Sequence, residues 1–158
     1  MNIFRKQHQG FSLLEVLISV VVLAVGLLGI AALQVHLIRD NHSAQLRSIA
    51  IAQAGGMIDR MRANYSGVKS GYYSNISGIG SAPTCTTCTN SQIAQRDAFE
   101  WNTSNAQLLP SGQGTVVANG NRYTVTLRWD NERTGATGIN CSGNAAVDLT
   151  CLVMEVQL

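Results

Sequence analysis

Charged residues are scarce in this sequence, and neither sign dominates. Lysine and arginine number 11 against 9 aspartates and glutamates, so the formal net charge of the 158-residue chain is only +2. An excess this small does not favour nucleic acid or an acidic substrate as the main partner. We therefore expect no nucleic-acid partner, and the length is that of one domain of ordinary size.

Histidine is also rare, and the sequence has no recognisable catalytic cluster. His8 lies close to the N-terminus, and His36 and His42 are six positions apart, so they do not share one face of a helix. The Asp-Asn-Glu sequence at 130–132 could bind calcium, but acidic residues at a turn are more commonly just solvated. We therefore expect no metal site, no cofactor and no enzymatic activity.

Apolar residues are gathered in one long run near the N-terminus. Across residues 11–33 the only polar side chains are Ser12, Glu15 and Ser19. At about 1.5 Å per residue, a helix over this run is roughly 34 Å long, enough to cross a hydrocarbon layer of about 30 Å. The basic pair Arg5-Lys6 stands in front of the run, which holds the N-terminus in the cytoplasm and exports the residues that follow.

A cleaved signal peptide is an alternative interpretation of this run. The apolar part of such a peptide usually spans about 7–15 residues, has no acidic residue and ends at a small-residue cleavage site. Ala31-Ala32 could serve as such a site, but the uninterrupted stretch after Glu15 is longer than a signal peptide requires. We therefore expect a retained membrane-spanning helix over residues 11–33.

Glu15 is the residue in this run that most needs an explanation. A carboxylate in a membrane-spanning segment costs at least about 2.5 kcal/mol and is by default a candidate functional site. One interpretation is that Glu15 only reaches back to the cytoplasmic interface. The other supposes a cut between Gly10 and Phe11, which creates a positive amino group one helical turn from Glu15 and on the same face. Two such helices side by side could pair the amine of one subunit with the carboxylate of the next.

The residues around that cut resemble a known leader. Gly10-Phe11-Ser12-Leu13-Leu14-Glu15 in front of a long aliphatic run is similar to the type III leader and assembly helix of type IV pilins and type II secretion pseudopilins. The resemblance implies that a prepilin peptidase cuts after Gly10, that the new N-terminal Phe11 is methylated, and that Glu15 acts in subunit assembly. Major pilins of that family usually carry a helix-bending proline in this segment, and its absence here favours a minor subunit.

Four cysteines follow the apolar run, at Cys85, Cys88, Cys141 and Cys151. An even number in a small, loop-rich domain favours disulfides and an oxidising compartment such as a periplasm. Cys85-Thr-Thr-Cys88 also fits half of a zinc site, but nine residues separate the other two cysteines and no histidine lies nearby. A redox motif is the other alternative for this pair, although no βαβ unit follows it.

The middle of the chain predicts a second helix after a loop. The apolar helix is expected to continue to Arg62. Residues 63–90 have the composition of a loop, and a short helix is expected over 91–108. The apolar stripe of the first helix continuation consists of Val35, Ile38, Leu46, Ile49, Ala50, Met57 and Met61, and that of the short helix of Ala94, Ala98, Trp101 and Leu108.

Strand patterns dominate the C-terminal third. Residues 114–118 are rich in β-branched side chains, an Asn-Gly-Asn turn follows, and residues 123–129 alternate apolar and polar side chains. Residues 149–158 predict a last strand with Leu152, Met154, Val156 and Leu158 facing inward. One apolar and one solvated face is typical of an antiparallel sheet that lies on a helix, which gives an α+β fold.

These elements define four expected parts of the chain. They are a cleaved leader at 1–10, a membrane and assembly helix at 11–33, its amphipathic continuation at 34–62, and an exported globular domain at 63–158. A long helix packed on a small antiparallel sheet is also the fold that the pilin resemblance implies.

Cys141 and Cys151 bracket a loop before the last strand, similar to the C-terminal disulfide loop of many pilins, and Cys85 can close a small loop with Cys88. We therefore predict these two pairs, which together are one of the three connectivities that four cysteines allow.

The later segments resemble one branch of the same family. Residues 57–64, Trp101, 109–114 and 123–129 are similar to the PilV-type minor pilins, also called type IV pilus modification proteins. The resemblance implies a minor pilin that helps to initiate pilus assembly and enters the filament near its tip. A type II secretion pseudopilin is the alternative, and a membrane-anchored periplasmic enzyme is the least favoured one because no catalytic cluster emerges.

The resemblance also implies partners and a location. The partners are other minor and major pilins, prepilin peptidase and the inner-membrane pilus assembly machinery. Before assembly the chain would lie in the inner membrane, with its N-terminus in the cytoplasm and its C-terminal domain in the periplasm. After assembly it would be part of the pilus at the cell surface.

Overall fold

The computed structural model describes residues 12–158, and the chain divides into two compact units, residues 1–41 and 42–158. The cleavage and methylation site predicted at Gly10 and Phe11 lies outside the described residues. Helix α1 (Leu13–Ala63) begins in the first unit and ends in the second, one residue beyond the predicted end at Arg62.

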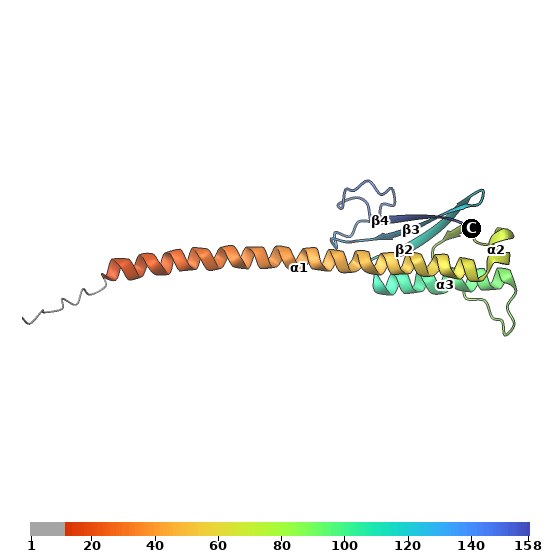
Figure 1. The fold of residues 1–158 in the computed structure, drawn as a ribbon, viewed down its shortest axis with the longest axis horizontal. Coiled ribbons are helices and arrows are strands. Elements are labelled where there is room, and N and C mark those ends of the chain that lie inside the picture. Colours follow the sequence, from red (N-terminus) through yellow and green to blue (C-terminus); the bar gives the residue numbers. More distant parts are fainter. Residues whose placement is uncertain (1–11) are drawn as a thin grey trace, which may run out of the picture. The chain divides into compact units, whose positions relative to one another are not determined.

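The second unit contains the rest of the secondary structure. Four strands form one antiparallel sheet in the order β1-β2-β3-β4, and α3 runs alongside the second part of α1 (Figure 1). The predicted α+β fold, with a long helix packed on a small antiparallel sheet, is therefore confirmed. After α1 the elements are α2 (Tyr65–Lys69), β1 (Asn75–Ser77), α3 (Asn90–Leu108), β2 (Gln113–Asn119), β3 (Arg122–Trp129) and β4 (Thr150–Gln157).

The core of the second unit lies between the two long helices and the sheet. Strand β3 contributes every second side chain, which confirms the alternation predicted for residues 123–129. Trp101 of α3 packs directly on the backbone of Gly114, where a Cβ atom would collide with the indole ring. The buried apolar residues from α1 are Leu46, Ala50, Ala54, Met57, Ile58 and Met61, and those from β3 are Tyr123, Val125, Leu127 and Trp129.

The hairpin between β2 and β3 fixes the register of the sheet. Asn119 pairs with Arg122, so Gly120 and Asn121 form a two-residue turn. Gly120 has a φ of 63°, a left-handed conformation that glycine adopts at no steric cost. The pairing aligns Val116 with Val125, and both side chains are fully buried.

The prediction of an unbroken loop over residues 63–90 is wrong. The side chain of Asn64 accepts a hydrogen bond from the Gly67 N–H at 3.3 Å and caps the short helix α2. Strand β1 forms because Ile76 pairs with Val116 of β2, a residue that is distant in sequence. The first of these elements depends on a local cap and the second on a tertiary contact, and composition alone reveals neither.

Two predicted apolar stripes are also only partly correct. Leu108 of α3 leaves 48% of its surface exposed, and the buried face of α3 instead includes Asp97, Asn102 and Asn105. Val35 and Ile38 of α1 are exposed as well. Asp97 and Asn102 occupy this face because their side chains bond to neighbouring elements, which a hydrophobic pattern does not register. The buried side chain of Asn105 has no hydrogen-bond partner within residues 12–158.

Candidate functional site

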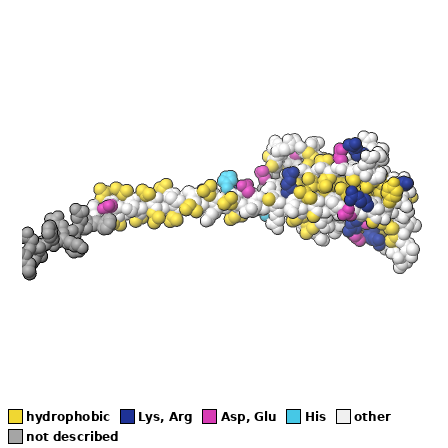
Figure 2. All heavy atoms as spheres, viewed as in Figure 1, with side chains coloured by type: hydrophobic (Ala, Val, Ile, Leu, Met, Phe, Trp, Pro, Cys, Tyr) yellow, Lys and Arg dark blue, Asp and Glu magenta, His cyan; other side chains and the backbone are white. Residues whose placement is uncertain are grey.

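The first part of α1 presents an uncovered apolar surface. Every leucine, isoleucine and valine from Leu13 to Ile38 leaves between 52% and 86% of its surface exposed. Figure 2 shows these apolar side chains along the helix. By length and composition α1 can cross a membrane, and among the described residues no other helix can. An apolar surface of this length needs lipid or other apolar helices around it.

Glu15 lies in the first turn of this apolar helix. Ser12 caps the helix: its hydroxyl accepts a hydrogen bond from the Leu14 N–H at 3.2 Å, and its carbonyl oxygen accepts one from the Glu15 N–H at 3.0 Å. A carboxylate so close to a helix N-terminus is favoured by the helix dipole. Within residues 12–158 no hydrogen bond or ion pair engages the Glu15 carboxylate. Glu15, the one acid of residues 13–33, therefore has its bonding capacity free for a partner.

The two serines of the apolar run are satisfied locally. The Ser19 hydroxyl donates to the carbonyl oxygen of Glu15 at 2.7 Å, one turn back along the helix. Together with the cap at Ser12, this bond leaves Glu15 as the polar side chain of residues 13–33 that lacks a partner in the described chain. The sequence singled out Glu15 by its cost in a membrane but did not reveal these two serine bonds.

A polar cluster joins the last turns of α1 to α3 in the second unit. Arg60 contacts Asp97 at 3.1 Å and Glu100 at 2.7 Å through one guanidinium nitrogen. The Tyr73 hydroxyl donates to the other Asp97 oxygen at 2.6 Å and accepts from the Asn64 amide at 3.1 Å. Burial opposes the charge of Arg60, but the bonds to Glu100 and Asp97 prevail and raise its pKa. Burial, with the bond to Asp97, also raises the pKa of Tyr73.

This cluster was missed by sequence reasoning, although a partial signal was present. Asp97 and Trp101 lie one turn apart on α3 and therefore share a face. Trp101 donates its indole N–H to the carbonyl oxygen of Gln53 at 2.9 Å, so both residues fasten α3 to α1. A charged residue one turn from a buried tryptophan is the pattern that could have indicated the contact.

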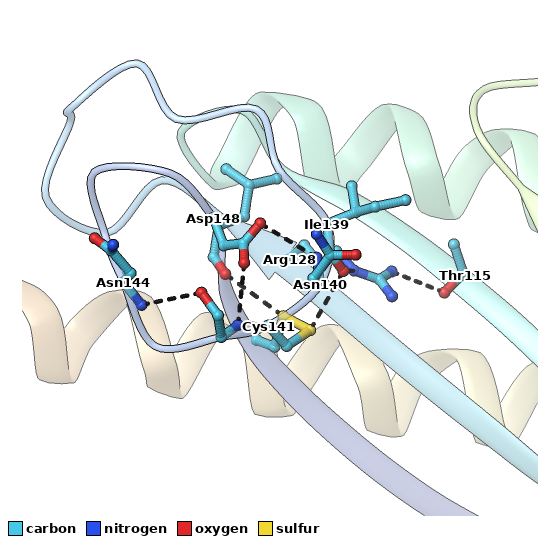
Figure 3. The surroundings of a disulfide bond; sticks show 10 residues. Thr115, Arg128, Ile139, Asn140, Cys141, Asn144 and Asp148 are labelled. Carbon is cyan, nitrogen blue, oxygen red and sulfur yellow. Dashed lines mark hydrogen bonds between the residues drawn. A yellow bond between two sulfur atoms is a disulfide. The ribbon is translucent and has the colours of Figure 1, made fainter.

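The loop before β4 is organised around the disulfide Cys141–Cys151 and the carboxylate of Asp148 (Figure 3). The Asp148 oxygens accept hydrogen bonds from the Ser142 N–H at 3.2 Å and from the Asn140 N–H at 3.4 Å. Hydrogen bonding by Ser142 outweighs the effect of burial and lowers the pKa of Asp148. Arg128 of β3 donates to the Ile139 carbonyl oxygen at 3.1 Å, which ties the loop to the sheet.

The alternative of a calcium site at residues 130–132 gains no support from the bonding of Asp130. Its carboxylate accepts from the Thr134 N–H at 3.0 Å and from the Gly135 N–H at 2.8 Å. Burial acts to raise the pKa of Asp130, but these bonds prevail and lower it. The side chain of Asn131 is hydrogen-bonded to the Ser43 hydroxyl of α1. Among residues 12–158 no three His, Cys, Asp or Glu side chains are grouped closely enough to hold a metal ion.

The cysteines are joined in the two predicted pairs, Cys85 with Cys88 and Cys141 with Cys151. The first pair has a Cα–Cα distance of 5.3 Å and the second one of 5.6 Å, both in the usual range. Because Cys85 and Cys88 are bonded to each other, their sulfurs are not free to form the half zinc site considered above. Of the histidines, His36 is exposed, and His42 is one of the residues that line an open groove of about 400 Å³.

Comparison with known proteins adds one match. Residues 5–31 match the family described as the prokaryotic N-terminal methylation motif, which covers the predicted cleavage position, Glu15 and most of the apolar run. Neither the curated proteins nor the solved structures contain a match to this chain.

Proposed function

We propose that this pilin-like chain with a prepilin leader is a minor pilin of a type IV pilus, that it helps to initiate assembly, and that it enters the filament near its tip. In this proposal prepilin peptidase cuts after Gly10 and Phe11 is methylated. Before assembly the processed chain lies in the inner membrane, with residues 63–158 in the periplasm. Its partners are other minor and major pilins and the inner-membrane assembly machinery.

The observation that carries the proposal is the Glu15 carboxylate, which has no partner in residues 12–158 and stands in an exposed apolar helix. In a bilayer such a group costs at least about 2.5 kcal/mol unless it finds an opposite charge. A cut after Gly10 provides that charge, because the new amine at Phe11 lies one helical turn away on the same face. Pairing between adjacent subunits neutralises both charges and fixes the axial offset of the helices.

Two further features support a subunit that is exported and assembled. The apolar side chains of residues 13–38 are all exposed, so a bundle of like helices can cover them once the chain leaves the lipid. The second unit has a core of its own and two disulfides, which suit an oxidising periplasm. The run of residues 11–33 has no proline, which favours a minor over a major subunit.

A type II secretion pseudopilin is the second candidate. The match at residues 5–31 is to a processing motif, and a pseudopilin carries the same leader. Neighbouring genes for pilus motors and minor pilins favour the first candidate, and neighbouring secretion genes favour the second. A strain that lacks this chain provides the direct test. Loss of surface pili with normal secretion of exoproteins is expected, and the reverse pattern would establish the pseudopilin.

Processing is tested on the protein itself. Intact-mass measurement of the membrane-extracted chain should show a mature N-terminus at Phe11 with one added methyl group. Gly10→Val should retain all ten leader residues, because a branched side chain does not fit where the peptidase requires glycine. Gly29→Val is the matched control, since a Cβ at Gly29 meets no atom within 4 Å and lies far from the cut. A wild-type chain that keeps residues 1–10 would contradict the proposal.

A further inference from the structure

The two disulfides of this chain have very different surroundings. Cys141–Cys151 closes the larger loop, and that loop is also held by Asp148 and Arg128. Cys85–Cys88 closes a ring of only four residues in the segment between β1 and α3. A smaller loop restricts the unfolded chain less, so this bond contributes less to stability in the chain-entropy description. Stability is therefore the weaker reason for the presence of Cys85–Cys88.

The small ring is open to solvent. Thr86 and Thr87 between the two cysteines are exposed, and Cys85 and Cys88 are themselves partly exposed. Exposure matters because exchange between a thiol and a disulfide requires a direct approach of the attacking sulfur to one sulfur of the bond. A partner with a protruding dithiol can reach this bond.

A positively charged side chain lies next to one of the two sulfurs. The guanidinium of Arg96 lies 3.7 Å from the Cys88 sulfur, and Arg96 takes part in none of the ion pairs within residues 12–158. Cys88 also directly precedes Thr89, the N-cap of the 19-residue helix α3. A nearby arginine and a helix N-terminus both stabilise a thiolate over a thiol. Cys88 is therefore the better leaving group of the pair.

The first turn of α3, next to the ring, is held by hydrogen bonds that do not involve the disulfide. The Thr89 hydroxyl accepts from the Gln92 N–H at 3.3 Å, and the Gln92 side chain accepts from the Thr89 N–H at 2.9 Å, so a complete capping box starts α3. Asn64 in addition donates to the Asn90 carbonyl oxygen at 2.8 Å. Because none of these bonds uses Cys85 or Cys88, we expect the first turn of α3 to stay in place when the ring is open.

We propose that Cys85–Cys88 is a site of thiol–disulfide exchange, which a partner protein with a Cys-x-x-Cys dithiol reduces while Cys141–Cys151 stays oxidised. The first partner thiolate attacks the Cys85 sulfur, and the electron pair of the broken S–S bond leaves on Cys88 beside Arg96. The second partner thiolate attacks the partner sulfur of this mixed disulfide and releases Cys85. The partner dithiol is oxidised to a disulfide, and two electrons and two protons pass to Cys85 and Cys88.

The test uses the full-length protein in detergent micelles with a thioredoxin-class dithiol protein as the reductant. Freed thiols are alkylated at set times and assigned by peptide mapping. We expect Cys85 and Cys88 to be labelled at least about tenfold faster than Cys141 and Cys151. Fluorescence of the two buried tryptophans, Trp101 and Trp129, should not change, because the core stays folded. Equal rates for both disulfides, or unfolding on reduction of the first, would overturn the proposal.

Arg96 variants separate an electrostatic role from a packing role. Arg96→Gln should slow reduction about tenfold and raise the pH at which reduced Cys88 is half alkylated, whereas Arg96→Lys should keep both near wild type. Arg122→Gln is the matched control, since it removes an exposed arginine of β3 far from the ring in sequence. A dithiol protein without its second cysteine should be trapped on Cys85. Trapping on Cys88, or an unchanged Arg96→Gln profile, would refute the mechanism.

Discussion

The large apolar side chains of helix α1 are exposed in its first part and packed into the core near its end. From Leu13 to Ile38 every large apolar side chain is exposed, whereas Met57 and Met61 near the end of the same helix have no exposed surface. The first part has no core contacts within the described chain, so it must obtain its burial from lipid or from other subunits. One face of the second part is already buried in the core that α3 and the sheet complete. Substitutions in the first part should therefore act on assembly, and those in the second on folding.

Glu15→Ala provides the largest expected effect and the sharpest test of that comparison. It removes the acid that could meet the Phe11 amine of a neighbouring subunit, and breaking a buried pair costs about 3–5 kcal/mol. The protein should remain processed, stable and in the membrane, but it should be absent from sheared filaments. An immunoblot of the shear fraction, with pilus counts, measures this.

The controls for Glu15→Ala come from the same helix. Asp40→Ala removes an exposed carboxylate beyond the apolar run and should enter filaments normally. Glu15→Asp keeps the charge on a shorter side chain and should be intermediate. Normal incorporation of Glu15→Ala would mean that the carboxylate merely reaches the cytoplasmic interface.

Met57→Ala tests the other half of the comparison. Met57 is fully buried in the core, and truncation of a buried methionine to alanine costs about 2–5 kcal/mol in the free energy of unfolding. Leu28→Ala is the matched control, because Leu28 leaves 71% of its surface exposed. Thermal unfolding of the full-length protein in detergent, followed by tryptophan fluorescence, should show a lower midpoint for Met57→Ala and no change for Leu28→Ala. Equal effects would break the distinction between the two parts.

A smaller effect is expected within the polar cluster that joins α1 to α3. Asp97→Ala removes the acceptor of both Tyr73 and Arg60, and the buried tyrosine O–H is left without an acceptor at a cost of about 1–3 kcal/mol. Glu100→Ala removes the other carboxylate that Arg60 contacts. The Glu100 side chain is 47% exposed, so its loss should cost no more than about 1 kcal/mol. Urea unfolding of both variants in detergent compares them, and similar midpoints would contradict this order.

The parts of the molecule that followed from sequence are those with a local periodic signal. Apolar periodicity predicted the α1 helix and the alternation of β3, and a short local motif predicted the turn at Gly120. All three are confirmed. Glu15 was recognised as a candidate because a charge in an apolar run is costly wherever it points. Gly10 and Phe11, outside the described residues, remain predictions together with the assembly role of Glu15.

The elements that the sequence did not reveal depend on contacts between distant residues. Strand β1 is only three residues long and exists through its pairing with β2. Asp97 is charged, yet it is buried because Tyr73 and Arg60 satisfy its carboxylate. Leu108 fits the apolar stripe of α3 but is exposed near the C-terminal end of that helix. A local sequence pattern does not show which residues from distant parts of the chain pack against that segment.

The smallest expected effect concerns the dependence of stability on pH in the loop before β4. Asp148 has a lowered pKa in the folded protein, and an aspartate in an unfolded chain has a pKa of about 3.9. The folded state therefore holds fewer protons than the unfolded state in the interval between these two pKa values. The stabilisation from Asp148 is fully present above about pH 4 and is lost as the pH falls through the lower, folded pKa.

Asp148→Asn isolates this contribution. The variant has no carboxylate to titrate at this position, so its fall in stability on acidification should be shallower than that of the wild type. Asp59→Asn is the matched control, because Asp59 is exposed and bonds only to Arg62 on its own helix among residues 12–158. Unfolding midpoints of the full-length protein in detergent from pH 6 down to about pH 3, read by tryptophan fluorescence, compare the three proteins. Asp148→Asn should be less stable than Asp59→Asn at pH 6, and this difference should narrow only below about pH 4, where the Asp148 carboxylate of the control becomes protonated. Parallel curves would show that the Ser142 and Asn140 bonds to Asp148 do not act on the ionised carboxylate.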